Sequence, residues 1–93
     1  MTTTHEREAA FSAWRERNPL RAWRLAHDVT LMRLAGEAQV SISTLQLWEN
    51  GARTPRPAQF ETLARITGES HLAGAWRRWI HDRPNQAPRK RTR

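Results

Sequence analysis

Cysteine is missing from this 93-residue chain, so it can form neither a disulfide framework nor a thiolate metal site. There is no glycine-rich phosphate loop and no G-x-S-x-G nucleophile motif. The histidines show neither an H-x-x-x-H pair nor a carboxylate at metal-ligand spacing; they are His5, His27, His71 and His81. We therefore expect no metal, no cofactor and no enzymatic activity.

Long apolar runs are also missing. No stretch approaches the length that spans a membrane, and the N-terminal MTTTHERE lacks the apolar core of a signal peptide. We therefore expect a cytoplasmic protein without membrane contact. A chain of this length suits one small domain, whose core depends on large side chains. Five tryptophans supply such buried area: Trp14, Trp23, Trp48, Trp76 and Trp79.

Acidic residues are few, and the net charge is +7. The excess is uneven, because residues 19–82 carry eight arginines and six acids, whereas residues 83–93 carry five basic residues and no acid. The composition predicts a disordered basic tail over 83–93. A basic chain favours a polyanionic partner in general. The folded part is only mildly basic, so specificity must come from particular side chains.

Apolar periodicity predicts an all-α protein. Residues 1–18 read as an N-terminal helical extension that packs on the core or contacts a second subunit or another protein. Residues 19–82 form the main domain, with five helices. The predicted N-caps are Asn18, Thr30, Ser41 and Ser70, and Pro19 and Pro57 suit the first turn of the helices they begin. In the first of these, Leu20, Trp23 and Ala26 should face the core, while Arg21 and Arg24 should be solvated.

The stretch from Leu34 to Gly51 reads as two short helices joined by a tight turn. In the second helix, Leu45 and Trp48 share the side that would face the core. At 100° per residue the opposite side carries Ser43, Gln46, Leu47 and Asn50. A helix with this division can lie in a DNA major groove, although an ordinary helical hairpin shows the same periodicity.

The spacing LA-x-x-A-x-VS-x-x-x-L-x-x-WENG resembles the helix-turn-helix of the Cro/repressor family of the xenobiotic-response-element type. The matching residues are Leu34-Ala35, Val40-Ser41 and Trp48-Glu49-Asn50-Gly51, and the likeness extends over roughly Leu20 to Gly68. It implies a five-helix repressor-like domain that binds double-stranded DNA, with a structural role for Glu49. The base-reading positions it implies are Ile42, Ser43, Gln46 and Leu47. The implied contacts to the DNA backbone are Thr30, Leu31, Thr44, Asn50, Arg53, Thr54 and Arg56.

Two positions depart from the family pattern. Gln39 stands in the turn where the family usually has glycine, and a positive φ there costs about 1 kcal/mol for another residue. Leu31 stands where the family often has a glutamine that bonds a phosphate. Backbone N–H groups at Leu31 and Met32 can still hold a phosphate at the start of that helix.

The resemblance implies a transcriptional regulator, a repressor of the phage, plasmid or mobile-element kind, that binds an inverted-repeat operator as a homodimer. Small repressors of this family often pair through their last helix, so Leu72, Trp76, Trp79 and Ile80 either seal the core or form a dimer interface. One alternative is an antitoxin, whose N-terminal helix or tail would wrap a toxin. Contact with RNA polymerase, or a protein-interaction role without DNA binding, is also compatible with the sequence.

Overall fold

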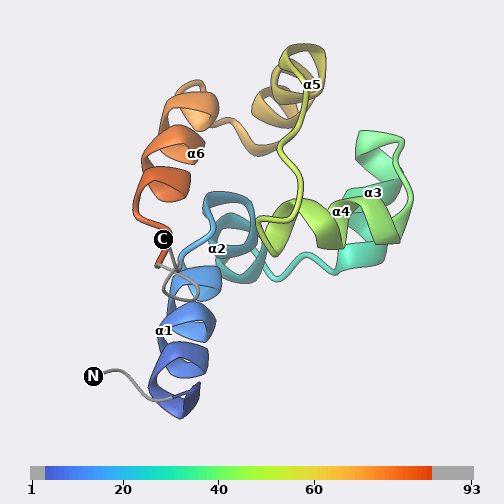
Figure 1. Ribbon diagram of the computed structural model, residues 1–93. Helices are drawn as coiled ribbons and strands as arrows, with labels where there is room; N and C mark the ends of the chain where they lie inside the picture. Colours follow the sequence, from blue (N-terminus) through green and yellow to red (C-terminus); the bar gives the residue numbers. More distant parts are fainter. Residues whose placement is uncertain (1–3, 85–93) are drawn as a thin grey trace.

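The computed structural model describes residues 4–84, which form six α-helices and no strand (Figure 1). The all-α prediction is therefore confirmed, with five helices after the N-terminal one. The predicted tail lies outside the described residues beyond Pro84, and the division into extension, domain and tail stays a prediction. The helices are α1 (Thr4–Glu16), α2 (Pro19–Ala26), α3 (Leu31–Ala38), α4 (Ile42–Glu49), α5 (Pro57–Thr67) and α6 (Leu72–His81).

Most helix starts follow the predicted caps. The Asn18 side chain accepts the N–H of Arg21 at 2.8 Å, and proline occupies the first turn of both α2 and α5. The predicted cap at Ser70 is wrong. The Leu72 N–H donates to the Glu69 carbonyl at 3.2 Å, so a turn precedes α6 and delays its start until after His71.

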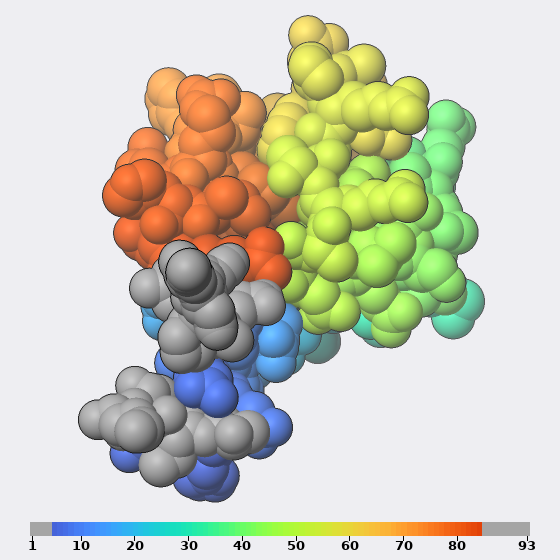
Figure 2. Space-filling model, viewed as in Figure 1, coloured from blue at the N-terminus to red at the C-terminus, as the bar shows by residue number. Residues whose placement is uncertain are grey.

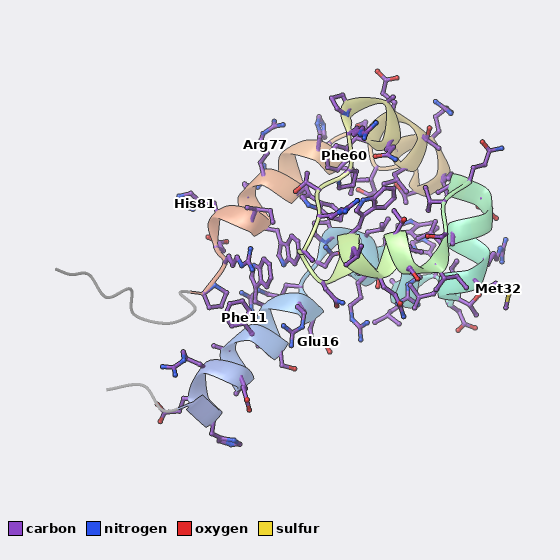
Figure 3. The ribbon with its side chains drawn as sticks, turned by 45° about the vertical axis from the view of Figure 1, so that its right-hand side comes forward. Phe11, Glu16, Met32, Phe60, Arg77 and His81 are labelled. Atoms are coloured by element: carbon purple, nitrogen blue, oxygen red, sulfur yellow. The ribbon has the colours of Figure 1, made fainter. Side chains whose placement is uncertain are left out.

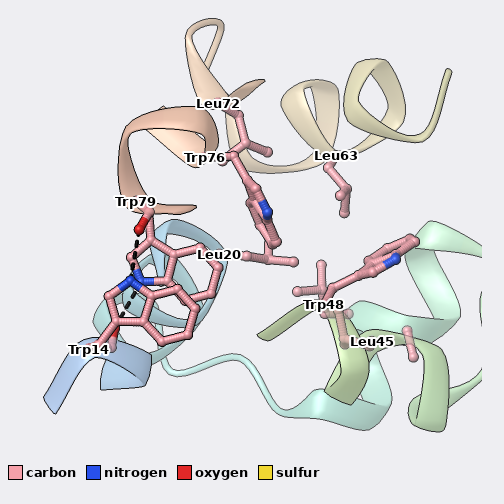
Figure 4. Close-up of a cluster of buried hydrophobic side chains, with 10 residues drawn as sticks. Trp14, Leu20, Leu45, Trp48, Leu63, Leu72, Trp76 and Trp79 are labelled. Atoms are coloured by element: carbon pink, nitrogen blue, oxygen red, sulfur yellow. Dashed lines mark hydrogen bonds between the residues drawn. The ribbon is translucent and has the colours of Figure 1, made fainter. Parts of the chain in front are cut away.

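The core lies where the later helices meet the last turn of α1 (Figure 4). Its fully buried large apolar side chains are Trp14, Leu20, Leu34, Leu45, Leu63 and Trp76. The first turns of α1 project away from the rest of the molecule in both ribbon views (Figures 1 and 3). Within the described residues, no helix is long and apolar enough to cross a membrane.

Trp14 of α1 and Trp79 of α6 form a reciprocal pair, which we name the tryptophan clasp. Their rings stack with centroids 4.0 Å apart and planes 2° apart. Each indole N–H donates to the backbone carbonyl of the other residue, at 2.7 and 2.8 Å (Figure 4). Edge contacts extend this aromatic series to Phe11 on one side and through Trp76 to Phe60 on the other. The clasp thus joins α1 to α6, and the series reaches α5.

The structure corrects the predicted inner face of α2. Leu20 is buried and Trp23 half-buried, but Ala26 is exposed. Arg24 was predicted to be solvated and is instead only 7% exposed. It lies one turn after Leu20, so the same helix face carries it into the core. The buried guanidinium charge is neutralised by an ion pair with Glu49 of α4.

Three of the four candidates on the last helix pack in the core of the single chain, while a role at a dimer interface stays a prediction. Leu72, Trp76 and Trp79 are 3%, 1% and 5% exposed within a single chain. They therefore fill the core role, the first of the two that the sequence allowed. Ile80, which is half-buried against the core, is the one member of the set with remaining exposed surface.

Candidate nucleic-acid interface

Helices α3 and α4 are joined by a turn centred on Gln39. This residue has φ 61° and ψ 42°, so the predicted positive φ is confirmed at a non-glycine position. The Val40 N–H donates to the Ala35 carbonyl at 3.0 Å, and the Gln39 N–H donates to Gly36 at 3.2 Å. These bonds close the end of α3 in the manner of a left-handed helix cap. The chain then turns directly into α4.

Ser41 fixes the start of α4. Its Oγ accepts the Thr44 N–H at 3.0 Å, and its hydroxyl donates to Thr44 Oγ1 at 2.9 Å. The hydroxyl proton of Thr44 therefore remains available to an outside acceptor. Leu45 and Trp48 point inward and are 0% and 2% exposed, as the periodicity predicted. The inner face of α4 is thus buried in the core.

The outer face of α4 mixes apolar and polar side chains. Ile42 and Leu47 are 42% and 37% exposed, although both are large and apolar. Ser43, Gln46 and Asn50 are exposed as well, and their side chains make no hydrogen bond within residues 4–84. Amide and hydroxyl groups in this state can pair with base edges, and the apolar pair can contact thymine methyl groups.

The C-terminal end of α4 is held by α2 and its cap. Arg24 donates to both carboxylate oxygens of Glu49, at 2.9 and 3.0 Å, and also to the Val29 carbonyl at 3.2 Å. The Asn18 Nδ2 donates to the Trp48 carbonyl at 3.4 Å. A buried, bidentate ion pair of this kind fixes orientation as well as position. Glu49 therefore has a structural role, while its partner Arg24 was missed, although its place one turn after Leu20 was a usable signal.

Residues 51–56 form a loop that folds back on the end of α4. The Ala52 and Arg53 N–H groups both donate to the Leu47 carbonyl, at 2.9 and 3.2 Å. Pro55 is buried and anchors the loop, whereas its neighbours Thr54 and Arg56 are exposed, as is Arg53. Figure 2 shows this loop and α4 on one face of the molecule. Neither arginine has an acidic partner among the described residues, so both guanidinium groups are free to bind an anion.

The N-terminus of α3 presents backbone donors. Thr30 Oγ1 accepts the Arg33 N–H at 3.1 Å, while the N–H groups of Leu31 and Met32 have no partner inside the helix. The Leu31 side chain packs against the core and Met32 is 69% exposed. Leu31 can therefore contribute to an anion site only through its backbone.

The structure thus groups the predicted base-reading residues on one helix face and sets the loop arginines at the end of the same helix. Whether each side chain contacts a base or a phosphate stays a prediction. Across residues 4–84 there is no group of three or more metal-ligating side chains that could hold an ion. The described residues of this surface present hydrogen-bonding groups, apolar side chains and positive charge.

Comparison with known proteins gives the family to which the chain belongs. No curated protein and no solved structure matches the chain. A family model described as a helix-turn-helix domain matches residues 18–73, from the cap of α2 to the start of α6. The match spans α3, the turn at Gln39 and α4, and it covers more than half of the chain. The chain therefore belongs to the helix-turn-helix family of DNA-binding domains.

Proposed function

We propose that this protein is a sequence-specific transcriptional regulator that represses by occupying a promoter. The observation that carries the proposal is the outer face of α4. It exposes Gln46 and Ser43, which have no side-chain partner among the described residues, while Leu45 and Trp48 hold the helix in place. Its activity is binding rather than catalysis, and it acts in the cytoplasm. A small domain that fills a promoter needs no second activity to block transcription.

Base reading falls to four side chains of α4. Gln46 can pair with adenine through its amide, and the Ser43 hydroxyl can serve several bases. Ile42 and Leu47 contact thymine methyl groups. This set is short and partly apolar, so the shape and deformability of the DNA add to specificity.

Contacts to phosphates surround this reading face. Arg53 and Arg56 bind phosphates through their guanidinium groups, and Thr54 adds a hydroxyl. The Leu31 N–H, beside the Thr30 cap, holds a phosphate at the N-terminus of α3. Thr44 and Asn50 complete the set from the two ends of α4. These contacts fix the register of the helix in the groove without reading sequence.

Two copies bind one operator in this proposal. A two-fold symmetric pair of recognition helices requires an inverted repeat, with half-sites about one helical turn apart. The aromatic side chains of α6 are buried within each chain, so the two copies meet through other residues, with Ile80 as the remaining candidate on that helix.

Selection of the full-length protein on a random duplex pool tests the proposal. We expect enrichment of one inverted-repeat motif, and a native mass of two chains per duplex. No enrichment over random sequence at low salt would contradict sequence-specific binding. Enrichment of a single half-site with one chain bound would contradict the homodimer and leave base reading in place.

A second candidate is an antitoxin that binds a toxin protein and represses its own operon. The first turns of α1 support it, because they project from the fold and expose Glu8, Ala9 and Ala10 (Figure 3). A helix in this position can lie in a partner's groove. Affinity purification from the native host would recover a stoichiometric toxin if this is correct. Recovery of a homodimer alone would favour the simple repressor.

A further inference from the structure

The tryptophan clasp lies beside Gly51, the first residue of the loop 51–56. We call this loop the DNA-contact loop, after its proposed role. Gly51 is buried and has φ 79°. A Cβ placed on it would lie 2.5 Å from Trp14 Cη2 and 3.1 Å from Trp79 Cη2. Both indoles therefore occupy the space beside the Gly51 backbone that a side chain at residue 51 would need. No side chain larger than hydrogen fits there unless the clasp moves.

Both members of the clasp lie outside residues 18–73, the part of the chain that matches the helix-turn-helix family. They are 65 residues apart in sequence. The clasp is thus a contact outside the family domain, between one residue that precedes the domain in sequence and one that follows it. Stacking and two buried hydrogen bonds hold the rings in one arrangement, so the surface they offer to Gly51 is rigid.

Only one residue separates Gly51 from Arg53. The Gly51 N–H donates to the Trp48 carbonyl at 3.1 Å, and the next two N–H groups donate to Leu47. The loop is therefore held from α4 on one side and from the clasp on the other. If the clasp is removed, the loop keeps its bonds to α4 but loses the surface that limits its movement, and the Arg53 guanidinium shifts relative to α4.

We propose that the tryptophan clasp positions the DNA-contact loop, so that α1 is part of the DNA-binding unit although it lies outside the family domain. The inference rests on the proposed function. Trp14 and Trp79 do not touch DNA; they are positioning residues that act through Gly51. Their loss changes the number of phosphate contacts rather than the bases that are read.

The first test measures affinity for the selected operator over a series of salt concentrations. We expect Trp14→Ala to lower affinity at least tenfold and to reduce the slope of log affinity against log salt by about one, the loss of one phosphate contact. Trp14→Phe keeps a ring but loses the indole N–H, so its affinity and salt slope should lie between those of the wild type and Trp14→Ala. The matched control is Trp23→Phe, because Trp23 stacks on His27, the C-cap of its own helix, at 4.6 Å and makes no ring contact with either member of the clasp among the described residues. It should keep the wild-type slope.

Circular dichroism in the same buffers gives the folded fraction of each variant. A merely structural role for Trp14 would reduce the folded fraction and leave the salt slope unchanged. That outcome, in Trp14→Phe as well as in Trp14→Ala, would overturn the inference. If Trp14→Ala does not fold, Trp14→Phe and the double-mutant cycle below decide.

The second test is a double-mutant cycle of operator affinity between Gly51→Ala and Trp14→Phe. The phenyl ring is shorter than indole and removes the two closest clashes with a methyl group at residue 51, which are with Trp14 Cη2 and Cζ3. Gly51→Ala should therefore cost several-fold less affinity in the Trp14→Phe background than in the wild type. Additive effects would contradict the inference. If the wild-type protein binds no duplex, the proposed function fails first; if it binds and the slopes and cycle show no coupling, only the positioning role fails.

Discussion

Side chains on the outer face of α4 are exposed and free to bind a partner. Gln46 makes no bond within the described residues, while one position before it Leu45 is fully buried. Replacing Gln46 with alanine removes an amide that can pair with a base and leaves the core untouched. We expect the specific affinity to fall by about 1–3 kcal/mol at the base pair that this residue reads, with relaxed choice at that position only.

Competition binding against operators changed at single base pairs measures this effect. Wild-type affinity and selectivity in Gln46→Ala would show that another side chain does the reading. Thr62→Ala on α5 is a suitable control, because Thr62 bonds only to the Ala58 carbonyl of its own helix.

The pair of Arg24 and Glu49 concerns stability rather than recognition. The two side chains are 9% and 5% exposed, so Arg24→Met leaves a buried carboxylate with only Arg21, whose Nη1 lies 4.0 Å from it. We expect a loss of about 3 kcal/mol in the free energy of unfolding, measured by urea denaturation. The double variant Arg24→Met with Glu49→Leu should recover most of it.

The control for this prediction is an exposed ion pair. Arg33 and Glu37 lie one turn apart on α3 and are 68% and 47% exposed. Arg33→Met should change stability by no more than about 0.5 kcal/mol, because solvent screens such a pair. Equal losses in the two variants would show that the burial of Arg24 adds nothing to its pairing with Glu49.

Sequence reasoning succeeded at residues whose role depends on their own helix. The inward direction of Leu45 and Trp48 follows from periodicity alone, and the left-handed conformation of Gln39 was implied by the glycine that the resembled family usually has in that turn. Arg24 was placed in solvent because its partner is 25 residues away. Periodicity gives the direction of a side chain but not the element that meets it there.

At the scale of elements, α4 and the loop after it form one unit. The loop is tied to Leu47 through two backbone bonds and anchored by Pro55, and it extends two free arginines. We expect Arg53→Ala and Arg56→Ala each to weaken binding to all duplexes alike. Each should also reduce the slope of log affinity against log salt by about one, because each removes one phosphate contact.

Titration of operator and unrelated duplexes over a range of salt separates this effect from base reading. A loss confined to the operator would assign the arginine to a base instead of a phosphate. Arg65→Ala serves as the control, since Arg65 lies near the C-terminal end of α5, away from the loop, and its loss should leave the slope unchanged.

Element boundaries show a similar division between what could and could not be predicted. Caps at Asn18, Thr30 and Ser41 use a side chain and a backbone N–H three residues on, which sequence alone displays. The start of α6 depends on a backbone turn to Glu69, and no residue type marks it. The Ser70 cap failed for that reason.

At the scale of the whole molecule, two tryptophans pair across the fold, and no local sequence pattern indicated this pairing. The composition predicted that they supply buried area, and Trp14, Trp48, Trp76 and Trp79 do so. Which of them would pair was not predictable, because Trp14 and Trp79 meet from opposite ends of the chain. The burial of Leu72, Trp76 and Trp79 within one chain leaves Ile80 as the predicted dimer candidate on α6 that keeps exposed surface. The proposed dimer is therefore best tested by changing the operator DNA.

The spacing of the two half-sites provides that test. If two copies bind one face of the duplex, their recognition helices enter major grooves about one turn apart. Inserting five base pairs between half-sites rotates one of them by about half a turn. We expect affinity to fall to that of a single half-site, and the native mass of the complex to fall from two chains per duplex to one. Inserting a full turn restores the face but increases the separation, so affinity should recover only if the two copies can still touch. Unchanged affinity after the five-base-pair insertion would mean that each chain binds alone, and it would contradict the homodimer while leaving recognition by α4 intact.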